Sequence, residues 1–166
     1  MPSAEQIAAT LASLDLALPP VATPLAAYVP ALRHGDLVYT SGQLPMVDGE
    51  LLATGIVGDG ITVEQAQQCA QQCALNALAA VQSVAGDLSR VERIIKVVGF
   101  VASAPDFTGQ PAVINACSEL LGAVFGEQGV HARSAVGVAA LPLGAPVEIE
   151  MVVALTPGRE SDTWDE

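Results

Sequence analysis

Residues 131–153 constrain the fold more than any other stretch, because they contain two alternating patterns separated by a proline-rich break. From residue 133 to 141, side chains alternate as they do in a strand. After the break Leu-Pro-Leu-Gly-Ala-Pro, alternation resumes at 147 and predicts a second strand to 153. Both predicted strands carry charge in their interiors, at Arg133, Glu148 and Glu150. Such charges commonly lie on a solvated sheet face, but small residues around the arginine also suit a guanidinium that reaches into a cavity to bind a carboxylate.

A simple hairpin of these two strands would not bring Arg133 and Glu148 together. A turn at residues 142–145 would place Arg133 opposite about Ala154, which is ~20 Å from Glu148 along the strand. A shared site therefore requires another strand order or a second copy of the chain.

Length and charge limit the class of protein. The 166 residues predict about one domain with a good core. No apolar run approaches the ~18 residues of a membrane span, and the N-terminus lacks the pattern of a secretory signal, so we expect a cytoplasmic protein. Eighteen acidic and six basic residues give a net charge of −12, which disfavours nucleic acids and anionic membranes as partners.

The cysteines and histidines do not predict a metal site or a cofactor. Cys69 and Cys73 lie four apart on a predicted helix without a histidine or second cysteine pair to complete a zinc site. With Cys117 they are expected in the core, as free thiols in a reducing compartment. His131 could face the same cavity as Arg133, or it could be a loop or interface histidine.

The order of expected elements is that of an α+β domain. Ser3 to Gln6 form a capping box that opens a short helix to about Asp15, and a connector at 18–30 holds four of the eleven prolines. The following elements are two short strands, a helix, a long strand and a second helix, at 29–33, 37–40, 63–84, 91–102 and 106–125. We divide the chain into an N-terminal helix and connector (1–23), one domain (24–156) and an acidic flexible tail (157–166).

Ser41-Gly42-Gln43 follows the second short strand. A hydroxyl and bare N–H groups there could bind an anionic ligand, although an ordinary turn has the same composition. Asp48-Gly49 predicts a hairpin turn, and the glycine-rich stretch from there to Gly60 is expected to be a surface loop.

Two segments resemble the Rid family, also called the YjgF or L-PSP family. They are YTSGQLP at 39–45 and ARSAVGVAALPLGAPVEIE at 132–150, with Asn115 between them, and the likeness extends over roughly residues 24–155. The resemblance implies a chorismate-mutase-like fold, in which two helices pack on one face of a mixed sheet, assembled as a homotrimer.

The resemblance also implies hydrolysis, without any cofactor, of reactive 2-imino and enamine acids to 2-keto acids and ammonia, in clefts between subunits. Arg133 would hold the substrate carboxylate and Glu148 would activate water. The implied substrate-binding residues are Tyr28, Ser41, Gly42, Asn115 and the backbone at Ala135.

Departures from the compact deaminase branch of the family leave other functions open. This chain has an N-terminal helix, Ala135 where that branch often has Cys, and His131 where it has Pro. A first alternative is a non-catalytic trimeric module that binds small carboxylates or senses a partner. A second is an endoribonuclease, which the acidic charge disfavours.

Overall fold

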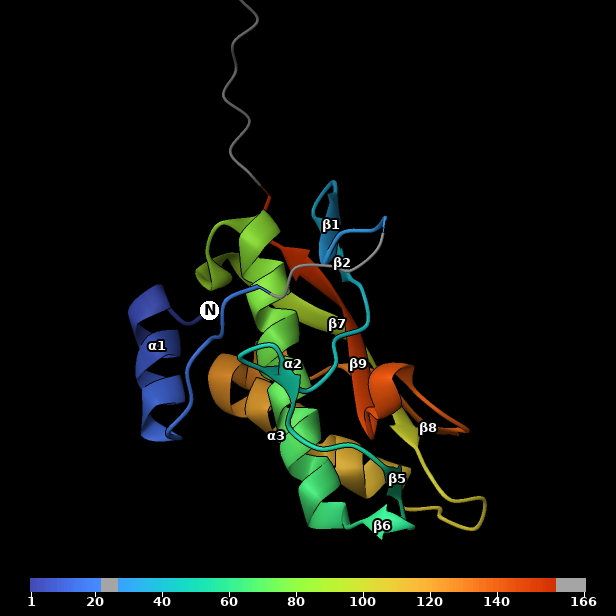
Figure 1. The fold of residues 1–166 in the computed structure, drawn as a ribbon. Helices are drawn as coiled ribbons and strands as arrows, with labels where there is room; N and C mark the ends of the chain where they lie inside the picture. Colours follow the sequence, from blue (N-terminus) through green and yellow to red (C-terminus); the bar gives the residue numbers. More distant parts are fainter. Residues whose placement is uncertain (22–26, 158–166) are drawn as a thin grey trace, which may run out of the picture.

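The computed structural model describes residues 1–21 and 27–157, and within them the fold is α+β (Figure 1). A five-stranded sheet has the order β1-β2-β9-β7-β8. It is mixed, because β8 runs parallel to β7 whereas the other neighbours are antiparallel. Its strands are β1 (Ala31–His34), β2 (Leu37–Thr40), β7 (Val91–Ala102), β8 (Ala132–Val138) and β9 (Val147–Leu155).

Two long helices, α2 (Val63–Ala85) and α3 (Gln110–Phe125), cover one face of the sheet. The N-terminal helix α1 (Ala4–Ser13) packs outside them, against α3 and the 3₁₀ turn η1 (Leu88–Arg90). The predicted capping boxes at Ser3 and Thr62 are confirmed, since each hydroxyl accepts a hydrogen bond from the third helical N–H. Gly86, with φ 85°, ends α2 as predicted.

The predicted start of α3 at Asp106 is wrong, because the helix begins at Gln110. Residues before it form a turn in which the Phe107 N–H donates to the carbonyl of Ala104 at 3.0 Å. Added β-carbons at Gly58 and Gly109 would lie 3.2 and 2.8 Å from Phe107, which shows how closely this side chain fills the turn. The partly buried ring lies against Gly109, the residue at which the helix is capped.

The strand predicted at 133–141 is shorter, because β8 ends at Val138. Its pairing partner β7 ends at Ala102, which lies opposite Val138. Residues 139–141 therefore have no neighbouring strand with which to form backbone hydrogen bonds. The chain then forms the short turn η3 (Pro142–Gly144) and enters β9, which lies on the other side of β7. The two strands therefore do not form a hairpin.

The stretch between β2 and α2 is more ordered than the expected surface loop. The hairpin at Asp48-Gly49 is confirmed and joins β3 (Met46–Val47) to β4 (Glu50–Leu51). Beyond it, β5 (Ile56–Val57) pairs with β6 (Gly60–Ile61), and Val57 is fully buried. This segment is anchored through the bridge between Val57 and Ser103.

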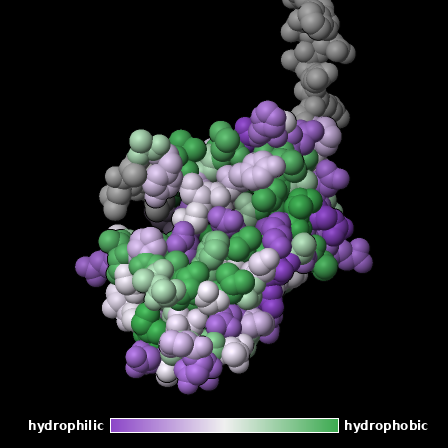
Figure 2. All heavy atoms as spheres, turned by 90° about the vertical axis from the view of Figure 1, so that its right-hand side faces the viewer, coloured by the Kyte–Doolittle hydropathy of each residue, from purple (hydrophilic) through white to green (hydrophobic). Residues whose placement is uncertain are grey.

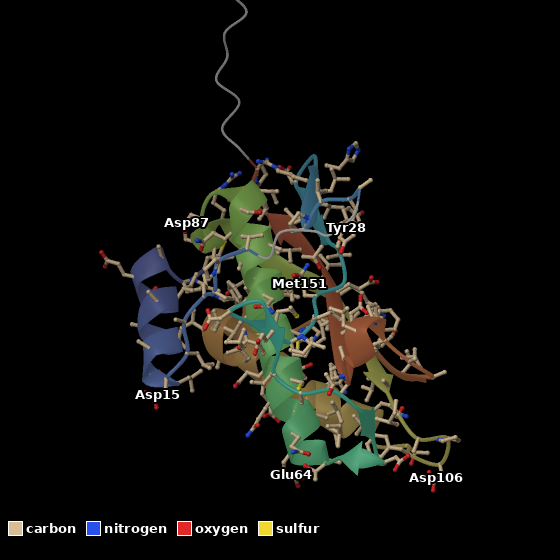
Figure 3. The ribbon with its side chains drawn as sticks, in the orientation of Figure 1. Asp15, Tyr28, Glu64, Asp87, Asp106 and Met151 are labelled. Carbon is tan, nitrogen blue, oxygen red and sulfur yellow. The ribbon has the colours of Figure 1, made fainter. Side chains whose placement is uncertain are left out.

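The core lies between the sheet and the helices α2 and α3, and the three cysteines lie in it as predicted. Alternate residues of β9 are buried against the helices, and Met151 lies near the middle of this layer (Figure 3). No helix in the described ranges combines the length and hydropathy needed to cross a bilayer. Most of the acidic tail and part of the connector lie outside the described residues, so the division of the chain at 23/24 and 156/157 stays a prediction.

Candidate functional site

The sheet places Arg133 and Glu148 on opposite faces. Arg133 lies beside Val97 of β7, and Glu148 lies beside Phe100, three positions further along the same strand. Directly paired residues point to the same face, and residues an odd number of positions apart point to opposite faces. Arg133 therefore lies on the face that α2 and α3 cover, and Glu148 lies on the other, open face.

Arg133 is held by the side chains of α3. Its Nη1 group donates to Asn115 Oδ1 at 2.9 Å and to Ser118 Oγ at 3.2 Å. Asn115 and Ser118 are three residues apart, so they lie on the same face of the helix. The two predicted site residues Arg133 and Asn115 are thus brought together, and Ala135 follows on the same side of β8.

Ser118 was not found from the sequence, and it connects Arg133 to His131. Ser118 Oγ lies 3.0 Å from His131 Nε2, and His131 Nδ1 lies 2.6 Å from the carbonyl oxygen of Gly129. A serine three positions after Asn115 on one helix face was the signal available in the sequence. His131 therefore faces the Arg133 cluster.

Glu148 is packed against the turn after β2. An added β-carbon at Gly42 would overlap the Glu148 carboxylate, so glycine lets this backbone lie against the carboxylate without displacing it. Gln43 and Ile149 exchange backbone hydrogen bonds at 2.8 and 3.0 Å, which fix the turn against β9. The sequence prediction that Gly42 allows close approach is explained by this contact.

Ser41 and Tyr28 belong to the same side of the molecule as Gly42. The Ser41 hydroxyl donates to the carbonyl of Val29 at 2.6 Å and its N–H donates to that of Pro30 at 2.9 Å. These bonds tie the turn to the segment that contains Tyr28, which is 54% exposed (Figure 3). We name Ser41, Gly42 and Glu148, with Tyr28 on the segment tied to their turn, the glutamate half-site. The arginine half-site consists of Asn115, Ser118, His131, Arg133 and Ala135.

Burial raises the pKa of Glu148 above its ordinary value of 4.5, and the charge of Glu150 adds to this effect. The two carboxylates lie on the same face of β9, as their spacing predicts. In the described part of the chain neither Glu148 nor Arg133 has an ion-pair partner. A carboxylate with a raised pKa can accept a proton from water more readily than an ordinary one.

All three cysteine thiols are buried. Burial raises the pKa of Cys69 to about 11 and that of Cys117 to about 12, so both stay protonated at neutral pH. Cys73 is fully buried, and its thiol donates to the Val147 carbonyl at 3.5 Å. Among the described residues, no group of three or more histidine, cysteine or acidic side chains gathers to hold a metal ion.

The open face of the sheet carries exposed apolar side chains. Leu32 and Tyr39 lie opposite each other on β1 and β2 and are 59% and 45% exposed, and Val136 on β8 is 43% exposed. Figure 2 shows apolar residues gathered among polar ones on the side where the strands lie in Figure 1. Lys96 adds a cation to this face and donates to Ser134 at 2.8 Å.

Comparison with known proteins identifies the family. The model of the family described as endoribonuclease L-PSP matches residues 20–155. The chain belongs to this family, which is the one that its two motifs resemble.

Individual relatives resemble nearly the whole chain. Protein TCP17 of Trypanosoma cruzi is 44% identical over 151 residues, which are 90% of this chain and 94% of that protein. The crystal structure of a protein of unknown function from Agrobacterium tumefaciens, Atu1372, is similar with a TM-score of 0.87 and 46% identity, over 92% of this chain and 94% of that one. A 2-iminobutanoate/2-iminopropanoate deaminase of Dermatophagoides farinae is 35% identical over 133 residues, or 80% of this chain and 88% of that protein.

Proposed function

We propose that the chain is a cofactor-free deaminase, which hydrolyses reactive 2-imino and enamine acids to 2-keto acids and ammonia in sites formed between two copies. The observation that carries the proposal is the separation of Arg133 and Glu148 onto opposite faces of one sheet. Arg133 can bind a carboxylate and Glu148 can accept a proton. Within one copy, however, they lie on opposite faces of the sheet and cannot both contact one small substrate. The similarity to a 2-iminobutanoate/2-iminopropanoate deaminase supports the choice of reaction.

The assembly that we propose is a homotrimer with a chorismate-mutase-like fold. The exposed side chains of Leu32, Tyr39 and Val136 favour burial of the open face against another copy. In a cyclic trimer, each contact joins two different surfaces of neighbouring copies. Such a contact can place the arginine half-site of one copy against the glutamate half-site of the next.

The proposed chemistry uses few groups because a protonated imine carbon is already electrophilic. Arg133 holds the substrate carboxylate, and Tyr28, Ser41, Gly42, Asn115 and the backbone of Ala135 line the rest of the pocket. Glu148 takes a proton from water while the water oxygen bonds to the imine carbon. Glu148 then gives this proton to the amine nitrogen. The C–N bond breaks as the carbonyl forms, the hydroxyl proton returns to the Glu148 carboxylate, and ammonia is released. An enamine first takes a proton on carbon to become the imine.

Nucleic acids and membranes are not partners in this proposal. The family model carries the word endoribonuclease, but a net charge of −12 opposes phosphate binding. RNA cleavage by protein free of contaminating nucleases, lost on Arg133→Ala substitution, would favour that activity instead.

Mixing two inactive variants tests the proposal most directly. Arg133→Ala and Glu148→Gln chains are purified, dissociated together and reassembled in equal amounts, and keto-acid release is followed from imines made in place by an amino-acid oxidase. If each site takes its arginine and its glutamate from different copies, about a quarter of the sites in a random mixture regain both residues. Arg33→Ala, which removes an arginine at the far edge of the sheet, is the matched control.

Two outcomes contradict the proposal. Wild-type protein that accelerates no imine, but binds 2-keto acids saturably, would indicate a carboxylate-binding module. Variants that are inactive singly and gain nothing on mixing would place the site within one copy.

A further inference from the structure

The arginine half-site contains a pair, Ser118 and His131, that the proposed reaction does not use. Both side chains are partly buried, and they connect the middle of α3 to the residue before β8. His131 is fixed at its other end by Gly129. An added β-carbon at Gly129 would overlap the backbone carbonyl of Leu121, so the loop that presents this acceptor is tightly packed on α3.

The hydrogen-bond partners determine where the protons lie. A carbonyl oxygen only accepts, so the bond between His131 Nδ1 and the Gly129 oxygen places the proton on Nδ1. In the neutral imidazole, Nε2 is then an acceptor and takes the Ser118 hydroxyl proton at 3.0 Å. The lone pairs of the Ser118 oxygen are left to accept from Arg133 Nη1 at 3.2 Å.

Arg133 is thereby held on one side only. The two Nη1 hydrogens are used by Ser118 and Asn115. In the residues that the structure describes, no hydrogen bond is formed by Nε or Nη2 of this guanidinium. Two parallel N–H groups along this edge match the two oxygens of a carboxylate.

We propose that Ser118 and His131 are positioning residues that direct the Nε and Nη2 edge of Arg133 toward a planar carboxylate, as in 2-keto and 2-imino acids. The inference rests on the proposed function and deepens it, because it names the pair that prepares the anchor. His131 acts through Ser118: it orients the hydroxyl so that its oxygen, and not its hydrogen, faces the guanidinium. The pair touches no reacting atom, so its loss weakens binding and spares the chemical step.

The test measures pyruvate binding by calorimetry beside the steady-state kinetics of imine hydrolysis. Ser118→Ala and His131→Ala are each expected to raise the pyruvate Kd and the KM about tenfold, with kcat within about threefold of wild type. The double variant is expected to be little worse than either single one, because the two residues act through one bond. His131→Gln, whose Oε1 can accept the Ser118 proton, is expected to recover most of the affinity.

Matched controls and a fold check accompany the variants. His34→Gln changes the histidine at the β1 turn, and Ser13→Ala removes a hydroxyl in α1; both should leave Kd and KM unchanged. If Ser118→Ala fails to fold by circular dichroism, Ser118→Thr keeps the hydroxyl and is compared with His131→Ala.

The outcomes separate this inference from the proposed function. Turnover in wild type with variant Kd and KM within twofold of it, or a fall in kcat alone, overturns the role of the pair and leaves the deaminase standing. No turnover, with pyruvate binding weakened in both variants and recovered in His131→Gln, overturns the deaminase and supports the pair. A wild type that neither binds pyruvate nor hydrolyses imines overturns both.

Discussion

β8 and β9 carry the two charged residues of the candidate site, and the chain holds them in different ways. β9 pairs with β7 along its length, and on its other side with β2 at residues 152–154 and with Gln43 at Ile149. Its alternate side chains are fully or nearly fully buried. β8 is paired by β7 alone, and none of its residues is buried. Backbone pairing thus fixes Glu148, whereas side chains of α3 and the preceding loop hold Arg133. Changes near Glu148 are therefore expected to alter the chemical step, and changes near Arg133 to alter binding.

The largest effect is expected from Glu148→Gln. Removing the general base should lower kcat about 10²- to 10⁴-fold, while pyruvate still binds because Arg133 is intact. Steady-state kinetics and calorimetry on the same preparation measure both quantities. Glu92→Gln, an exposed change on β7, should leave them unchanged. Pyruvate binding lost in Glu148→Gln, with kcat preserved, would reverse the roles of the two strands.

Gly42→Ala tests whether the backbone beside Glu148 determines the position of its carboxylate. The new β-carbon would occupy the space of the carboxylate, which must move. Because a displacement of about 1 Å at a reacting group can cost about 10²-fold, we expect kcat to fall by that order. The melting temperature should change little, since only the end of a flexible side chain has to shift. Gly122→Ala, at a helical position with no atom close to the added β-carbon, is the control. Equal kcat in the two variants would show that the backbone at Gly42 does not determine the position of the Glu148 carboxylate.

Local patterns predicted β7, β9 and α2 well, and physical reasons explain why. A capping box at Thr62 and a glycine at 86 mark the ends of α2, and alternation along β9 is complete because helices cover one face only. The partner of a strand is a long-range property that alternation cannot supply. The sequence therefore did not indicate that β8 pairs with β7, or that Arg133 and Glu148 lie on opposite faces of the sheet.

The candidate site residues were proposed from the family motifs, and the residues that support them were not. Arg133, Asn115, Gly42 and Glu148 follow from the family motifs, and the structure places them in two groups. Ser118 follows Asn115 by three positions on the same helix face, but this spacing alone does not show that α3 approaches the loop that holds His131. The spacing of Arg133 and Glu148 along the sequence predicted that a shared site needs another strand order or a second copy, but it could not show which of the two applies.

Asn115→Asp tests whether the arginine half-site serves binding. A carboxylate 2.9 Å from Nη1 would neutralise part of the anchor's charge and compete with the substrate. We expect KM and the pyruvate Kd to rise about tenfold, with kcat little changed. Gln82→Glu adds the same charge at an exposed position of α2 and should have no such effect. A fall in kcat with KM unchanged would show that Asn115 serves the chemical step instead.

The smallest effect is expected from Glu150→Gln, through the pKa of Glu148. Burial is the larger cause of the raised pKa and remains, but the repulsion from Glu150 is removed, so the pKa of Glu148 should fall toward 4.5. Hydrolysis requires ionised Glu148, and the acidic limb of the kcat/KM profile should therefore move to lower pH. Glu92→Gln should leave the limb in place.

The pH dependence of the free energy of unfolding gives a second measure of the raised pKa of Glu148. Since the folded protein binds the Glu148 proton more tightly than the unfolded chain, this residue lowers the free energy of unfolding at neutral pH. That cost disappears as pH falls through the raised folded pKa to the ordinary value of 4.5. Chemical denaturation across this range should show a smaller pH dependence in Glu150→Gln than in wild type, and a smaller one still in Glu148→Gln. An unmoved acidic limb together with unchanged pH dependence of unfolding would mean that the partner half-site, and not β9, determines the proton affinity of Glu148.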